Sequence, residues 1–175
     1  MQKECELKML PISFPFEQPP SEGKAIEIAD GILWMRLPLP MALDHVNVYA
    51  IRDGDGWCIV DTGFFSKRTQ SIWETLLSGP LNGDPITRVL ITHHHPDHIG
   101  MAGWFQSKLN SEVISSRTAW MYGRMMILDT QKEWPEEVLA FYKSTGIDEE
   151  IFSYWLDRGP RNFSDVCYPM PSGFT

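Results

Sequence analysis

The sequence predicts an α/β fold for residues 23 to 116. Short apolar segments alternate there with segments of helical periodicity, which is typical of a sheet covered by helices. In one place a strand is followed by a helix and then by a second strand that ends near Ile114, and this order implies a right-handed parallel crossover. With 175 residues and a hydrophobic content of 43%, the chain has the size of one compact domain with a sizeable core.

Turn residues set the limits of the expected elements. Residues 1–22 contain several prolines and little periodicity, so we expect an extended N-terminal arm. Asp30-Gly31 separates two short strands, Asp-Gly pairs within 52–56 favour a hairpin, and Gly79-Pro80 ends a helix. In chain order, the expected core elements are two strands within 25–37, hairpin strands Val46–Ile51 and Trp57–Val60, helix Ser66–Leu77, strand Ile86–Ile91, helix His98–Leu109 and strand Glu112–Ile114.

Residues 117–175 change character. Three helices are expected at about Arg117–Leu128, Pro135–Ser144 and Asp148–Asp157, with Asp148 as an N-cap. They are rich in Met and aromatic residues, which suit adaptable or bulky apolar contacts. One interpretation is amphipathic packing on the core. The other is a helical lid that shapes an apolar substrate pocket.

The segment from Thr92 to Gly100 carries the strongest chemical signal. It reads Thr-His-His-His-Pro-Asp-His-Ile-Gly and fits a His-x-His-x-Asp-His pattern with His94 on a spacer position. Imidazole and carboxylate are common ligands of zinc and similar ions. Four such groups so close together favour two metals at a spacing on the order of 3.5–4 Å. A purification tag would be terminal, and a structural zinc site would usually bring cysteines.

At this point the chain resembles the metallo-β-lactamase superfamily, most of all its glyoxalase-II-like hydrolases. The similarity extends over roughly residues 30 to 115. It is carried by three stretches: Asn47–Ile51 with Trp57–Gly63, Ile86–Thr92, and His93–Gly103. The resemblance implies the N-terminal part of a four-layer αβ/βα sandwich with a dinuclear metal site at one edge.

The resemblance also implies roles for individual residues. His93 and His95 would bind the first metal, and Asp97 and His98 the second. Asp97 would also help to orient a metal-bound hydroxide. Asp61 would hydrogen-bond a ligand imidazole, as metal-bound histidines usually require; its alternative role is to cap a turn. The implied cofactors are two divalent ions, with zinc first and iron or manganese as alternatives.

The chain departs from the family pattern in one respect. The family requires a third His for the first metal, a bridging Asp and a further His, all after the first motif. No histidine follows His98 in this chain. Four later aspartates read as surface or helix-cap residues: Asp129, Asp148, Asp157 and Asp165. We therefore expect the chain to be the N-terminal portion of a longer protein, with Pro169–Thr175 leading into another strand.

Composition limits the partners. The net charge of −8 and pI near 5.0 argue against a nucleic-acid partner. Cys5, Cys58 and Cys167 lack CxxC spacing and are expected to be free thiols. No signal-peptide pattern or membrane span is apparent, so a cytoplasmic location is expected.

The leading functional hypothesis is a metal-dependent hydrolase that acts on a small ester, thioester or lactone through a metal-bound hydroxide. His45, just before the expected hairpin, is a candidate substrate contact or a plain polar loop residue. One alternative is a di-iron oxidoreductase on the same fold. The other is a catalytically incomplete fragment or interaction module, which would self-associate through exposed apolar surface.

Overall fold

A computed structural model describes residues 13–170 of the chain. Its centre is one six-stranded sheet with the strands in sequence order. The strands are β1 (Ile26–Ala29), β2 (Ile32–Pro38), β3 (His45–Asp53), β4 (Gly56–Val60), β5 (Ile86–Ile91) and β6 (Glu112–Ser115). Strands β1 to β4 pair antiparallel, whereas β4, β5 and β6 pair parallel. The expected hairpin and parallel crossover are both present.

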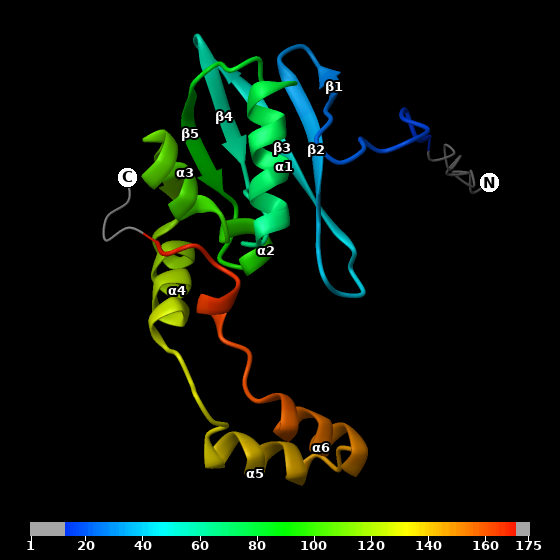
Figure 1. The fold of residues 1–175 in the computed structure, drawn as a ribbon, viewed down its shortest axis with the longest axis vertical. Coiled ribbons are helices and arrows are strands. Elements are labelled where there is room, and N and C mark those ends of the chain that lie inside the picture. Colours follow the sequence, from blue (N-terminus) through cyan, green and yellow to red (C-terminus); the bar gives the residue numbers. More distant parts are fainter. Residues whose placement is uncertain (1–12, 171–175) are drawn as a thin grey trace, which may run out of the picture.

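The helices follow the strands in the expected order (Figure 1). They are α1 (Lys67–Ser78), α2 (Pro96–Ile99), α3 (Ala102–Leu109), α4 (Arg117–Leu128), α5 (Glu136–Ser144) and α6 (Glu149–Arg158), followed by the short 3₁₀ helix η1 (Phe163–Asp165). Ser66 caps α1 by accepting a hydrogen bond from Thr69 N, and Asp148 caps α6. Within residues 13–170, no helix is both long and apolar enough to cross a membrane.

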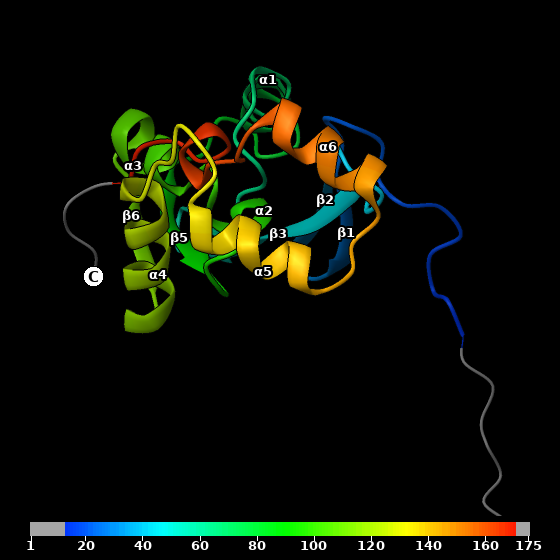
Figure 2. The ribbon, with the colours of Figure 1, turned by 90° about the horizontal axis from the view of Figure 1, so that it is seen from below.

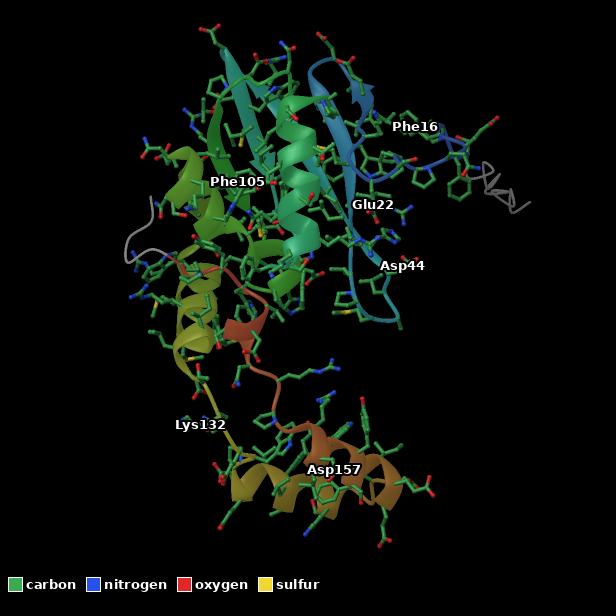
Figure 3. All side chains as sticks on the ribbon, in the orientation of Figure 1. Phe16, Glu22, Asp44, Phe105, Lys132 and Asp157 are labelled. Carbon is green, nitrogen blue, oxygen red and sulfur yellow. The ribbon has the colours of Figure 1, made fainter. Side chains whose placement is uncertain are left out.

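The core lies between one face of the sheet and helices α1 and α3. Alternate strand residues such as Val48, Ile59 and Val89 are fully buried on this face. Trp73 of α1 and Phe105 of α3 meet edge to face with their ring centroids 4.8 Å apart. Phe105 lies among these central helices and strands in Figure 3. Burial of such large aromatic side chains supplies much of the stability of a core.

The opposite face of the sheet is more open. Ile51 and Leu90 are 39% and 38% exposed there, and Trp34 is half-buried. Of the expected N-terminal arm, residues 13–22 are described, and Phe16 contacts Trp34 with ring centroids 6.0 Å apart. Residues 1–12, including Cys5, lie outside the described part, as do residues 171–175 of the expected C-terminal run-in. The six-stranded sheet with its helices confirms the predicted α/β fold class.

The helix expected from His98 to Leu109 is wrong in its limits. The structure has two helices, α2 from Pro96 and α3 from Ala102, with a break at Gly100 and Met101. A Cβ on Gly100 would lie 2.6 Å from Gly63 O, so this close backbone approach requires glycine. The backbone N–H of Met101 donates to Thr62 Oγ1 instead of continuing one helix.

Helices α5 and α6 form a pair that lies apart from the sheet. Figures 1 and 2 place this pair below the sheet edge that carries α2. No residue of either helix is buried, and Phe141 and Tyr154 are 63% and 60% exposed. The two helices contact each other through Tyr142 and Trp155, with ring centroids 4.9 Å apart. The expected packing of these two helices on the core is therefore absent, and their role as a lid stays a prediction.

Candidate metal centre

The motif residues lie on the turn that follows β5. β5 ends at Ile91, and α2 begins at Pro96 with His95 as its N-cap residue. Because β3 runs antiparallel to β4 and β4 runs parallel to β5, the start of β3 and the ends of β4 and β5 lie at one sheet edge. Side chains at such an edge often form the sites of α/β proteins.

The structure brings the four predicted ligands together. The ring centroid of His93 lies 4.5 Å from that of His95 and 4.0 Å from that of His98. Asp97 Oδ2 lies 3.3 Å from His98 Nε2. As placed, residues 13–170 contain no group of three or more His, Cys, Asp or Glu side chains that could hold a metal ion. The donor chemistry suits a divalent ion, but the side chains are not preassembled around a centre.

Asp61 connects β4 to this turn. Its buried carboxylate accepts hydrogen bonds from Thr92 N at 2.9 Å, from Thr92 Oγ1 at 2.7 Å and from His98 Nδ1 at 2.7 Å. Its backbone has a φ of 61°, in the left-handed region that Asp and Asn tolerate better than most residues. The bond to Nδ1 leaves His98 Nε2, the nitrogen near Asp97, for a ligand.

The electrostatics of the pair follow from these contacts. Burial opposes the charged form of Asp61, but the hydrogen bonds from His98 and Thr92 outweigh it and lower the pKa of Asp61. Burial also opposes the imidazolium of His98, yet the hydrogen bond and charge of Asp61 raise the pKa of His98. The pKa of His93 is lowered by burial and then by the charges of His98 and His95.

Thr62 is a residue of the site that sequence reasoning missed. It is fully buried, its backbone N–H donates to His98 O at 2.8 Å, and its hydroxyl donates to the same oxygen at 2.7 Å. The hydroxyl also accepts from Met101 N. Thr62 therefore fixes the turn between α2 and α3. The sequence signal that could have indicated Thr62 is the Asp61-Thr62-Gly63 triplet, but a motif this short has low specificity by itself.

Two further contacts hold the turn from the C-terminal side. The ring of His94 stacks on Tyr122 of α4, with centroids 5.2 Å apart and an interplanar angle of 30°. The backbone N–H of Tyr168 donates to Gly100 O at 2.7 Å. His94 is thus a spacer in the motif that nonetheless has a contact of its own. This structural role of His94 depends on Tyr122, a residue distant in sequence.

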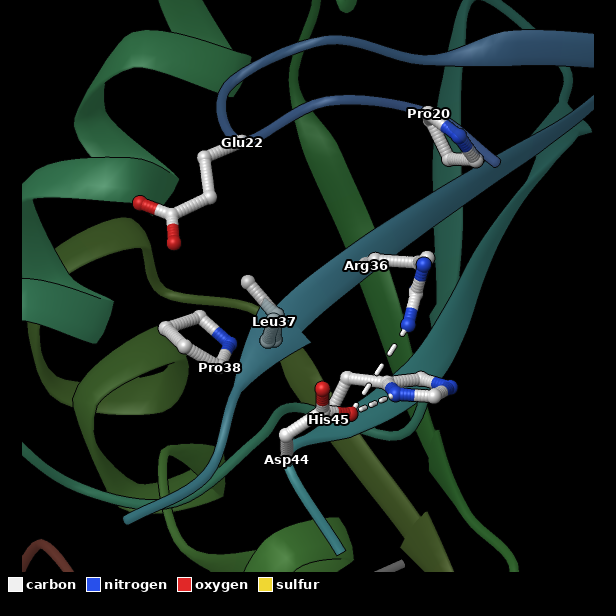
Figure 4. A pocket seen from close by; sticks show the side chains of 7 residues that line it. All are labelled: Pro20, Glu22, Arg36, Leu37, Pro38, Asp44 and His45. Atoms are coloured by element: carbon white, nitrogen blue, oxygen red, sulfur yellow. Dashed lines mark hydrogen bonds and ion pairs between the residues drawn. The ribbon is translucent and has the colours of Figure 1, made fainter. Parts of the chain in front are cut away.

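The remaining candidates lie elsewhere. His45 starts β3, bonds Asp44 through Nδ1, and lines a separate pocket (Figure 4). Of the four later aspartates, Asp148 caps α6 as the sequence predicted, and the carboxylate of Asp165 accepts a hydrogen bond from the N-cap residue of η1, Asn162 N. All four are exposed. Cys58 is half-buried and Cys167 is buried, and both are free thiols.

Comparison with known proteins agrees with this geometry. The family model of the metallo-β-lactamase superfamily matches residues 41–161, which include the motif turn, Asp61 and helices α4 to α6. The chain therefore belongs to the metallo-β-lactamase superfamily. The matches described next do not specify the glyoxalase-II-like branch.

Individual relatives extend this finding. The probable metallo-hydrolase YqjP of Bacillus subtilis is 25% identical over 63% of this chain and 34% of its own length. A β-lactamase domain protein from Burkholderia ambifaria superposes with a TM-score of 0.75 at 29% identity, over 91% of this chain and 45% of that one. The metallo-β-lactamase family protein TTHA1429 from Thermus thermophilus shares the fold, with a TM-score of 0.58, 24% identity, and coverage of 85% of this chain and 46% of that one. The chain thus spans less than half the length of these relatives.

Proposed function

We propose that this chain carries the first half of the metal centre of a metal-dependent hydrolase. The observation that supports this most is the cluster of His93, His95, Asp97 and His98, with Asp61 bonded to His98 Nδ1. Two divalent ions, zinc by preference, would lower the pKa of water and polarise the carbonyl of the substrate. The remaining ligands would come from residues outside the described part, from a longer chain or from a second subunit.

Each residue has a defined task in this proposal. His93 and His95 would hold one ion, and Asp97 and His98 the other. Asp61 keeps the proton of His98 on Nδ1, so that Nε2 presents its lone pair. Thr62 anchors the carbonyl of His98 and keeps the turn in place.

The substrate proposed is a small ester, thioester or lactone. Exposed Met and aromatic side chains of α4, including Met121, Tyr122 and Met125, supply apolar surface beside the turn. Such side chains fit bulky or flexible acyl groups. His45 would contact the substrate from the start of β3, which lies at the same sheet edge.

Metal content separates this proposal from its alternatives. The chain would be purified without chelator or added metal, and zinc, iron and manganese would be measured per chain. His95→Ala should lower metal content and His94→Ala, the matched control on the spacer, should not. Hydrolysis of a thioester and of a lactone would be followed on the same samples. Retention of metal by His95→Ala at the level of the control would contradict the ligand assignment, and iron in place of zinc would favour the di-iron oxidoreductase.

A catalytically incomplete interaction module is the second candidate. It is supported by the lack of a preassembled three-ligand group within residues 13–170 and by the open sheet face with Ile51 and Leu90. It predicts near-zero metal, no turnover and a concentration-dependent increase in mass. Sedimentation of the same metal-free samples measures the last of these.

A further inference from the structure

Helices α5 and α6 carry an apolar surface that no other part of residues 13–170 buries. The two helices have 9 and 10 residues, and none of these residues is buried. Isolated helices shorter than about 12–15 residues are marginal in water, so helices of this length depend on packing against another surface. Phe141, Ile151 and Tyr154 are all exposed on this pair. The pair therefore requires a partner surface.

Helix α4 has an exposed apolar stripe that matches this requirement. Met121, Met125 and Leu128 lie at the spacing of one helix face, and all three are exposed. Ala119 and Gly123, on the other side of α4, are buried. Methionine side chains adapt to irregular apolar surfaces. The stripe is thus suited to receive another apolar helix surface.

The two surfaces are also complementary in charge. Residues 136–158, which form α5, α6 and the turn between them, contain six acidic and two basic residues. Helix α4 contains Arg117 and Arg124 and no acidic residue. Because the whole chain has a net charge of −8, most of its surface repels an acidic helix pair, whereas α4 attracts one.

The linkers hold the pair away from the α4 helix of its own chain. Gln131 lies on one linker and Asn162 on the other. Gln131 N donates to Asn162 Oδ1 at 2.8 Å, and Asn162 Nδ2 donates to Gln131 O at 3.0 Å. A pocket of about 420 Å³, lined by Met126 of α4 and Val138 of α5 among others, lies between the two helices. Figures 1 and 3 show the pair displaced from α4 along these linkers.

From these features we infer that the α5–α6 pair is an interaction surface for a second copy of this chain. The pair of each protomer packs on the exposed α4 stripe of the other. This exchange is reciprocal, so one two-fold axis satisfies both pairs and both stripes. Arg117, one turn before Met121 on the same face of α4, then lies beside the acidic pair of the other protomer. The dimer requires neither metal nor turnover, so it stands independently of the proposed hydrolase function.

Sedimentation equilibrium of the metal-free chain over a wide range of concentrations tests the inference. We expect a reversible equilibrium between monomer and dimer. Arg117→Glu reverses the charge at the start of the stripe and should weaken dimerisation at least about tenfold. Lys67→Glu is the matched control, because it makes the same change of charge at the exposed first residue of α1, and it should dimerise as the unmodified chain does. Glutamate is favourable at both helix starts, so both variants should fold.

Mixing experiments identify which surfaces meet. Met125→Lys on α4 and Tyr154→Lys on α6 each place a charge in the apolar contact, and each should weaken dimerisation at least about tenfold. In a mixture of these two variants, one of the two exchanged contacts is intact, so the mixture should associate more tightly than either variant alone. Leu90→Lys on the open sheet face is the control and should dimerise normally. Circular dichroism checks that every variant is folded.

Three results would overturn the inference. The first is an unmodified chain that stays monomeric at every concentration, which would leave the pair to pack on its own chain. The second is a dimer that Leu90→Lys abolishes and Met125→Lys does not, which would place the contact on the sheet face. The third is a mixture of Met125→Lys and Tyr154→Lys that associates no better than its components, because the contact would then not be an exchange of helix pairs.

Discussion

Asp61→Asn is the sharpest perturbation of the metal centre. In Asp61, one oxygen accepts from Thr92 N, and the other accepts from both Thr92 Oγ1 and His98 Nδ1. In the variant, the amide nitrogen replaces the second oxygen. It can bond His98 Nδ1 only if that atom is an acceptor, so the proton of His98 moves to Nε2. The nitrogen that faces Asp97 would then be blocked as a ligand.

The cost in stability follows from the same contacts. Hydrogen bonds to a charged group contribute about 1.5–3 kcal/mol and neutral ones about 0.5–1.5 kcal/mol. In Asp61→Asn, two hydrogen bonds to a charged carboxylate become neutral ones, so the free energy of unfolding should fall by about 2–3 kcal/mol. Asn tolerates the φ of 61°, so no backbone strain is added. Asp61→Ala should lose more than Asp61→Gly by about 1–2 kcal/mol, because only alanine is strained there.

The pH dependence has a defined sign. The pKa of His98 is raised above 6.5, so its contribution to stability is complete below pH 6.5 and is lost as the pH rises through the raised value. The pKa of Asp61 is lowered below 3.8, so its contribution is present above pH 3.8 and is lost as the pH falls through the lowered value. The stability difference between Asp61 and its Asn variant should therefore be largest at weakly acidic pH.

Two assays test this reasoning. Urea unfolding followed by tryptophan fluorescence gives the stability of each variant as a function of pH, and long-range ¹H–¹⁵N NMR reports the protonated nitrogen of each histidine. The reasoning is refuted if Asp61→Asn changes the free energy of unfolding by less than about 0.5 kcal/mol, the range of an ordinary surface substitution, with His98 still protonated on Nδ1.

Two more predictions concern the supports of the turn. Gly100→Ala places a Cβ 2.6 Å from Gly63 O, so overpacking should lower the free energy of unfolding by about 1–3 kcal/mol. Thermal unfolding measures this change, and an unchanged midpoint temperature would contradict the close approach. Tyr122→Leu should remove the ring-current shift of the His94 ring protons in NMR spectra, whereas Tyr122→Phe should keep it, because the stack requires an aromatic ring and not the hydroxyl. Equal spectra for the two variants would exclude the stack in solution.

Much of the fold follows from local patterns. Ser66 and Gly79 marked the limits of α1, and Asp-Gly turn residues marked the hairpin of β3 and β4, because caps and turns depend on neighbours in sequence. The limits of α2 and α3 did not follow. The helical geometry is lost at Met101, whose backbone N–H donates to Thr62 Oγ1, and a helical periodicity contains no information about such a distant neighbour.

The sequence by itself determined the chemistry of the centre: which donor types are present, their spacing, and their place after a buried strand. Only the tertiary structure decided which groups support them. The parallel pairing of β4 with β5 sets Asp61 beside Thr92 and His98, and the path of α4 sets Tyr122 on His94. Ligand spacing is a property of a few consecutive residues, whereas hydrogen-bond partners are set by strand register and helix packing across the whole chain.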